Sequence, residues 1–79
     1  MDNDLLKQKI FLEEQLEWCR KQDFILEKME KLFSEMKALA EYARDYRLTE
    51  LELDKVNYEL EGYKREVNLL ERQLKYIFH

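Results

Sequence analysis

The residues of this chain that are able to do chemistry are few and scattered. The only histidine is the last residue, His79, so no Ser-His-acid or Cys-His arrangement can be proposed. The single cysteine, Cys19, is followed by Arg20 and Lys21, cationic neighbours of the kind that activate a thiol. Cys19 falls within an apolar stripe, however, and we expect it to be an inert, buried cysteine.

The carboxylates also lack a catalytic or metal-binding pattern. A di-iron helical bundle needs inward-facing Glu-x-x-His pairs, and no such pair occurs here. The glutamates instead cluster away from the apolar positions. With a single glycine, the chain cannot form a glycine-rich phosphate loop. The sequence therefore predicts a protein that is not an enzyme and that has no cofactor and no bound metal.

The amino-acid composition predicts which secondary structure the chain forms. Charged residues make up 41% of the 79 residues and apolar residues 46%, with one Gly and no Pro. That apolar content is too high for disorder, and a turn-rich β fold would need more Gly and Pro. We expect an all-α fold of long amphipathic helices, with residues 1–79 as a single oligomerisation or interaction domain.

The apolar residues between Trp18 and Tyr46 form the strongest pattern. Large apolar side chains recur every seven residues, a second column follows four residues later, and a third runs beside them. The three columns are Trp18, Ile25, Leu32, Leu39 and Tyr46; Met29, Met36 and Ala43; and Cys19, Leu26, Phe33 and Ala40. A stripe three residues wide is typical of a helix in a bundle rather than of a simple coiled coil.

The spacing changes after residue 46. From residue 50 onward, apolar residues alternate at three and four without a miss, as Leu53, Val56, Leu60, Tyr63, Val67, Leu70, Leu74 and Ile77. Thr49 and Glu52 have the spacing of a capping box, which marks a helix start. We therefore favour a helical hairpin with helices at about 4–46 and 50–78. The alternative is a continuous coiled-coil rod with a stammer near residue 46, because no Gly, Pro or Asn interrupts residues 44–49.

A hairpin this small leaves apolar surface uncovered, and residues 1–16 would extend past its second helix. Chains of this size usually need disulfides, metals or oligomerisation to be stable. Only oligomerisation remains here, so we expect a homo-oligomer, with a dimer favoured. The predicted oligomer core is Trp18, Ile25, Met29, Leu32, Met36, Leu39, Leu53, Val56, Leu60, Tyr63, Val67, Leu70, Leu74 and Ile77.

The second helix carries one further apolar pattern, nearly opposite its heptad face. Leu51, Tyr58, Gly62, Leu69 and Tyr76 follow one another at spacings of seven, four, seven and seven. We interpret them as a candidate face for a partner protein, with Gly62 allowing a close approach. The alternative interpretation is that they are ordinary exposed residues.

The distribution of charge and of apolar residues predicts whether the chain binds nucleic acid or crosses a membrane. The net charge of −4 is divided evenly, with 9 basic and 11 acidic residues in 1–47 and 5 basic and 7 acidic in 48–79. An even, negative distribution weighs against nucleic acid, so a nucleic-acid role for Lys64, Arg65, Arg72 and Lys75 is only a lesser alternative. Apolar runs are too short for a membrane span, and one free cysteine fits the cytoplasm. The initiating Met favours a whole small protein rather than a fragment.

The function that these observations predict is a self-associating coiled-coil or bundle module that acts as a small adaptor, regulator or inhibitor of a partner protein. The main alternative is a purely structural oligomerisation or spacer coiled coil. The sequence does not specify the partner, the process, the orientation of chains in the oligomer or their number.

Overall fold

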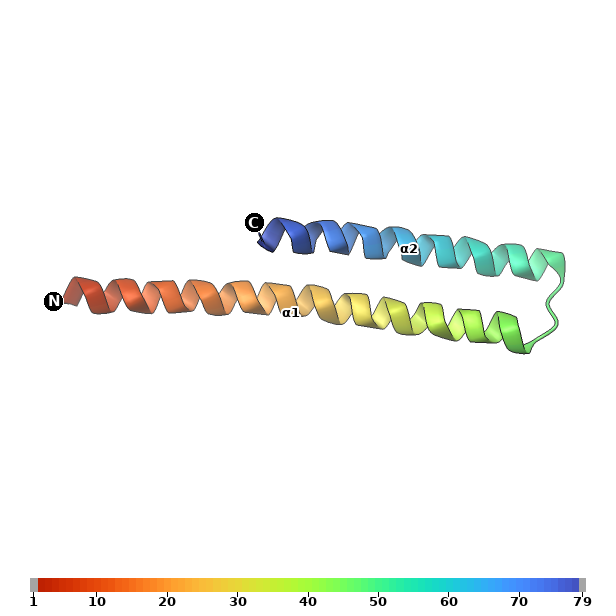
Figure 1. The fold of residues 1–79 in the computed structure, drawn as a ribbon, viewed down its shortest axis with the longest axis horizontal. Coiled ribbons are helices and arrows are strands. Elements are labelled where there is room, and N and C mark those ends of the chain that lie inside the picture. Colours follow the sequence, from red (N-terminus) through yellow and green to blue (C-terminus); the bar gives the residue numbers. More distant parts are fainter. Residues whose placement is uncertain (1, 79) are drawn as a thin grey trace.

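The chain folds as an extended hairpin of two antiparallel α-helices, shown in Figure 1. The computed structural model describes residues 2–78, with side chains for residues 3–77. Helix α1 spans Asp2–Asp45 and helix α2 spans Glu50–Phe78. The molecule measures 72 × 19 × 11 Å, whereas one unbroken helix of this length would extend about 115 Å. The predicted hairpin is confirmed, and the alternative of a continuous rod is wrong.

The turn is built by capping rather than by special backbone conformations. Thr49 Oγ1 accepts a hydrogen bond from the Glu52 backbone N–H at 3.2 Å, and the Thr49 N–H donates back to Glu52 Oε1 at 3.4 Å. These reciprocal bonds form the predicted capping box, which satisfies backbone donors at the start of α2. No residue described in the structure has a positive φ. The chain can therefore reverse here without Gly, Pro or Asn, because the side chains of Thr49 and Glu52 accept hydrogen bonds from backbone N–H groups at the start of α2.

Aromatic packing marks the end of α1. The Tyr46 N–H still donates to the Tyr42 carbonyl at 3.2 Å, one residue beyond the helix. The Tyr42 and Tyr46 rings lie with centroids 5.0 Å apart and an interplanar angle of 35°, a separation favourable for aromatic pairs. Tyr46 is largely exposed, so it ends the first apolar column without entering the core.

The two helices meet along two apolar columns of α1, not three. Buried or half-buried side chains of α1 recur at alternating spacings of four and three, as Trp18, Gln22, Ile25, Met29, Leu32, Met36, Leu39 and Ala43; Glu35 is half-buried beside this row. On α2 the predicted heptad residues face them. The most buried are Ile25, Val56 and Val67, at 6%, 7% and 8% exposure, while Leu53 near the turn is 40% exposed. We call this contact the interhelical seam.

The third column of α1 is left open, which corrects one expectation. Cys19, Leu26, Phe33 and Ala40 are all exposed, because one straight helix such as α2 can cover only a two-column seam. The prediction of a buried Cys19 is thus wrong for the single chain. A stripe three columns wide predicts that α1 packs against more than one helix. The hairpin itself supplies only one such neighbour, α2.

The capping box predicts a specific sensitivity of the turn. Replacing Thr49 by Ala removes the hydroxyl acceptor and should lower the free energy of unfolding by about 1 kcal/mol. Thr49→Ser keeps the acceptor and should stay close to the wild type. Urea unfolding followed by circular dichroism, at one fixed protein concentration, measures both. Equal losses in the two variants would show that the hydroxyl does not cap α2.

Candidate protein interaction surfaces

Helix α1 has 44 residues and α2 has 29, so the N-terminal part of α1 continues alone past the end of α2 (Figure 1). Trp18 marks the place where the two helices part. Its indole Nε1–H donates a hydrogen bond to the Ile77 carbonyl at 2.7 Å. This carbonyl is one of the last four of α2, which have no partner within their own helix. The bond fixes the end of α2 against α1. We call residues 3–17 the N-terminal arm.

The N-terminal arm is rich in apolar side chains that nothing in the hairpin covers. Leu5 is 68% exposed and Phe11 is 58% exposed. Large parts of Leu6, Ile10, Leu12 and Leu16 are exposed as well. The expectation that the first 16 residues overhang the hairpin is met for the part that the structure describes. A lone helical segment of about 15 residues is only marginally stable in water. The arm therefore needs either a partner helix or support from the rest of α1.

A second uncovered surface lies on α1 beside the interhelical seam. It consists of the third column, Cys19, Leu26, Phe33 and Ala40, and we call it the open edge of α1. A shallow groove of about 490 Å³ lies along it, lined by Leu26, Met29, Glu30, Phe33, Ser34 and Lys37. Phe33 is 50% exposed, and the groove combines three apolar residues with the charged Glu30 and Lys37. This combination is typical of a helix-docking surface.

The third surface is the outer face of α2, formed by Leu51, Tyr58, Gly62, Leu69 and Tyr76. Its large side chains are all exposed, and Tyr76 reaches 85%. A Cβ atom on Gly62 would meet only the Arg65 Nη2 atom, at an ordinary 3.8 Å. Nothing within the hairpin therefore requires glycine at this position. The outer face has the exposure that a partner-binding face needs, while its role stays a prediction.

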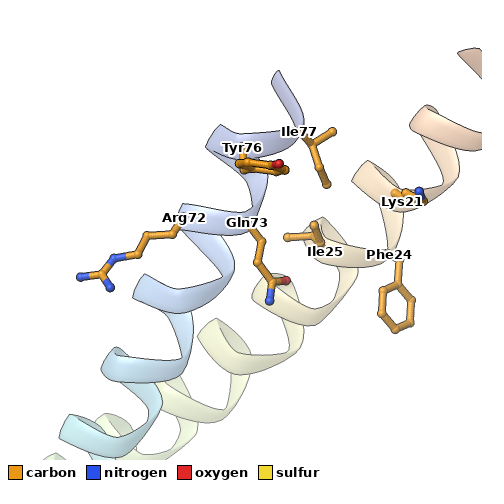
Figure 2. Close-up of a pocket in the computed structure, with 7 residues that line it drawn as sticks. All are labelled: Lys21, Phe24, Ile25, Arg72, Gln73, Tyr76 and Ile77. Atoms are coloured by element: carbon orange, nitrogen blue, oxygen red, sulfur yellow. The ribbon is translucent and has the colours of Figure 1, made fainter. Parts of the chain in front are cut away.

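Where α2 ends, the outer face adjoins a shallow groove between the helices. Its volume is about 500 Å³. Figure 2 shows Ile25 on α1 turned towards Ile77 and Gln73 on α2, whereas Phe24 and Arg72 extend away from the gap. Phe24 lies instead under Lys28, whose Nζ is 4.4 Å from the ring centroid, within reach of a cation–π contact. Tyr76 borders this groove but remains 85% exposed.

The edge of the hairpin opposite the open edge of α1 carries polar side chains beside Leu32, Leu69 and Leu70, and we call it the polar edge. Lys28, Glu35, Glu66 and Gln73 flank the seam there, together with Tyr63. The Glu35 carboxylate, by its charge, raises the pKa of the Tyr63 phenol above its ordinary value of 10.0. Desolvation, a hydrogen bond with Glu35 and the charges of Glu59 and Glu66 add to the rise. The Tyr63 phenol is thus held neutral. Sequence reasoning missed this pair, because its detection requires the register of α1 against α2.

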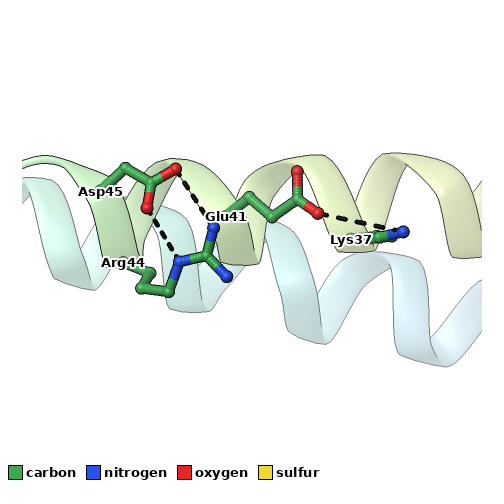
Figure 3. Close-up of polar contacts among 4 residues, drawn as sticks. All are labelled: Lys37, Glu41, Arg44 and Asp45. Carbon is green, nitrogen blue, oxygen red and sulfur yellow. Dashed lines mark hydrogen bonds and ion pairs between the residues drawn. The ribbon is translucent and has the colours of Figure 1, made fainter.

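Ion pairs on the surface contribute little to these features. Figure 3 shows Lys37 with Glu41, at 4.0 Å between Nζ and Oε1, and Arg44 with Asp45, at 2.8 Å between Nε and Oδ1. All four side chains are exposed, and Lys37 precedes Glu41, the less favourable order on a helix. Both pairs lie within the last turns of α1 and do not connect α1 to α2.

The raised pKa of Tyr63 predicts a pH dependence. Since the folded state favours the neutral phenol, its stabilising contribution is present below pH 10 and is lost as pH rises through the raised pKa. Glu35→Gln should move the pKa of Tyr63 back towards 10.0, because it removes the largest cause. Titration of ¹³C-labelled tyrosines by NMR measures this pKa directly. Glu41→Gln is the control and should leave Tyr63 unchanged; an unmoved pKa in Glu35→Gln would contradict the assignment.

Among residues 2–78, no three His, Cys, Asp or Glu side chains gather as a metal site would require. In the same range, neither helix has a stretch long and apolar enough to cross a membrane. Comparison with protein-family models, with curated proteins and with solved structures finds no match to this chain. The surfaces described above are therefore the basis for any functional assignment.

Proposed function

We propose that this chain is a non-enzymatic protein–protein interaction module, which self-associates through α1 and presents the outer face of α2 to a partner protein. Such a module would act as a small adaptor, regulator or inhibitor. The free cysteine is compatible with a reducing compartment, and we place the protein in the cytoplasm.

One observation carries this proposal: the imbalance between buried and exposed apolar side chains. Within the described part of the chain, only Ile25, Val56 and Val67 are buried, while sixteen large apolar side chains are exposed. A hairpin with so small a core has little hydrophobic stabilisation to oppose its conformational entropy. Self-association supplies the missing burial without disulfides or metals.

The distribution of the exposed side chains supports two separate contacts. The N-terminal arm and the open edge both belong to α1, whereas the outer face belongs to α2 and points away from the seam. A dimer that used α1 would leave the outer face free. Exposed tyrosines are common anchors in protein interfaces, and Tyr58 and Tyr76 are the most exposed aromatic side chains among residues 3–77.

The runner-up is a purely structural module that only oligomerises. The elongated shape, 72 Å long and 19 Å wide, suits a spacer as well as an adaptor. In that case the outer face would be either part of the oligomer core or ordinary surface. The two functions therefore differ in what happens when this face is made polar.

The test is a triple variant, Tyr58→Gln, Leu69→Gln and Tyr76→Gln, which keeps good helix formers on α2. We expect it to remain folded by circular dichroism and to keep the wild-type mass in sedimentation equilibrium. Photo-crosslinks from a probe that replaces Arg65, beside the outer face, to another protein in cells should fall at least tenfold. A matched control, Asn57→Gln, Asn68→Gln and Lys75→Gln, should change none of the three readouts.

Two outcomes would contradict the adaptor function. If the triple variant unfolds or dissociates, the outer face is core, and the structural module becomes the better account. If position 65 crosslinks only to further copies of the chain, in the wild type and in the control variant, the same conclusion holds.

A further inference from the structure

The open edge and the N-terminal arm are two halves of one continuous column. Leu5, Leu12, Cys19, Leu26, Phe33 and Ala40 follow one another at intervals of seven along the whole of α1. All six are exposed, so the column passes from the arm to the open edge without being covered by α2. On a helix this spacing places them on one face with a slow drift.

We propose that a second copy of this chain docks on this column in an antiparallel arrangement, so that the N-terminal arm of each copy covers Leu26 and Phe33 on the open edge of the other. This inference rests on the self-association in the proposed function and specifies its surface. Each arm would become the third helix beside the other copy's α1 and α2, giving a three-helix bundle at each end of a long central pair.

The symmetry of the column is the first argument for a second copy. A two-fold axis at Cys19 places Leu5 opposite Phe33 of the second copy, and Leu12 opposite its Leu26. All four of these large exposed side chains are then covered at once. In this register the arm, residues 3–17, lies beside residues 21–35 of the second copy, a segment of equal length that includes Leu26 and Phe33.

Charge gives the second argument, because it selects both direction and register. Lys9 is paired with Glu13 of its own helix, at 3.9 Å between Nζ and Oε1. In this arrangement it also lies beside Glu30 of the second copy, an attraction that occurs twice by symmetry. A shift by one heptad towards the turn places Lys9 beside Lys37 and Leu5 beside the small Ala40. A shift the other way leaves Phe33 uncovered. Only the register centred on Cys19 satisfies both the charges and the large apolar residues.

The arm's remaining faces favour the antiparallel direction as well. In a parallel pair, arm would face arm, and Phe11 would stay uncovered because neither arm has an α2 beside it. In the antiparallel pair, each arm meets a complete hairpin. Antiparallel helices also have favourably opposed dipoles.

Charge reversal tests the register. Lys9→Glu and Glu30→Lys should each weaken dimerisation by about five- to tenfold in sedimentation equilibrium, since each change makes two repulsive contacts. The double variant Lys9→Glu, Glu30→Lys should return to within about threefold of the wild type. Lys55→Glu and Glu61→Lys, which make the same changes of charge on α2, should have no effect. A dimer that none of these variants alters would overturn the inference.

Cysteine pairing tests the direction independently. On a Cys19→Ser background, mixed Lys9→Cys and Glu30→Cys chains should form a disulfide with each other under mild oxidation with diamide. The Lys9→Cys chain alone should not. Self-crosslinking of Lys9→Cys would show a parallel pair and overturn the inference, while the proposed self-association would stand. A mass of 9.9 kDa, that of one chain, at every concentration up to the millimolar range would overturn both.

Discussion

The apolar surface of α1 is larger than α2 can cover, and the other features of the molecule follow from that mismatch. α1 exceeds α2 by 15 residues in length and by one apolar column in width. The excess length becomes the N-terminal arm, and the excess width becomes the open edge. Burial of apolar area is the dominant favourable term in folding and association, so both surfaces favour contact with another helix.

The seam, by contrast, forms within one chain. Ile25, Val56 and Val67 form its centre, and Trp18 closes its far end by donating to the Ile77 carbonyl. The capping box at Thr49 fixes where α2 begins, so the register of the two helices is set from both ends. A fixed register is what keeps Glu35 beside Tyr63 on the polar edge and leaves the apolar column exposed on the opposite one. The hairpin thus has one fixed register of its two helices, although its core is small.

Several features were predictable from the sequence because they depend on local spacing. The heptad alternation from Leu53 to Ile77 predicted α2 and its seam face, and Thr49 with Glu52 predicted the helix start. The overhang followed from helix lengths alone. Two features were not predictable in the same way. The exposure of Cys19 depends on how many columns a single neighbour covers, and the Glu35–Tyr63 pair depends on register, a tertiary property.

The outer face of α2 was predictable from the sequence only as a set of residues. Its residues were identified from spacing, and the structure shows them exposed, yet exposure alone does not name an occupant. The column on α1 is more informative, because its two halves fit each other in size and charge.

Hydrogen exchange of the backbone amides tests the central claim most directly, namely that α1 is covered by a second chain. Amides of the N-terminal arm should be strongly protected at high protein concentration and should lose protection on dilution, because an uncovered arm is only marginally helical. Amides near Val67, at the centre of the seam, should respond less to dilution. Protection of the arm that does not depend on concentration, or an arm unprotected at millimolar concentration, would contradict the account.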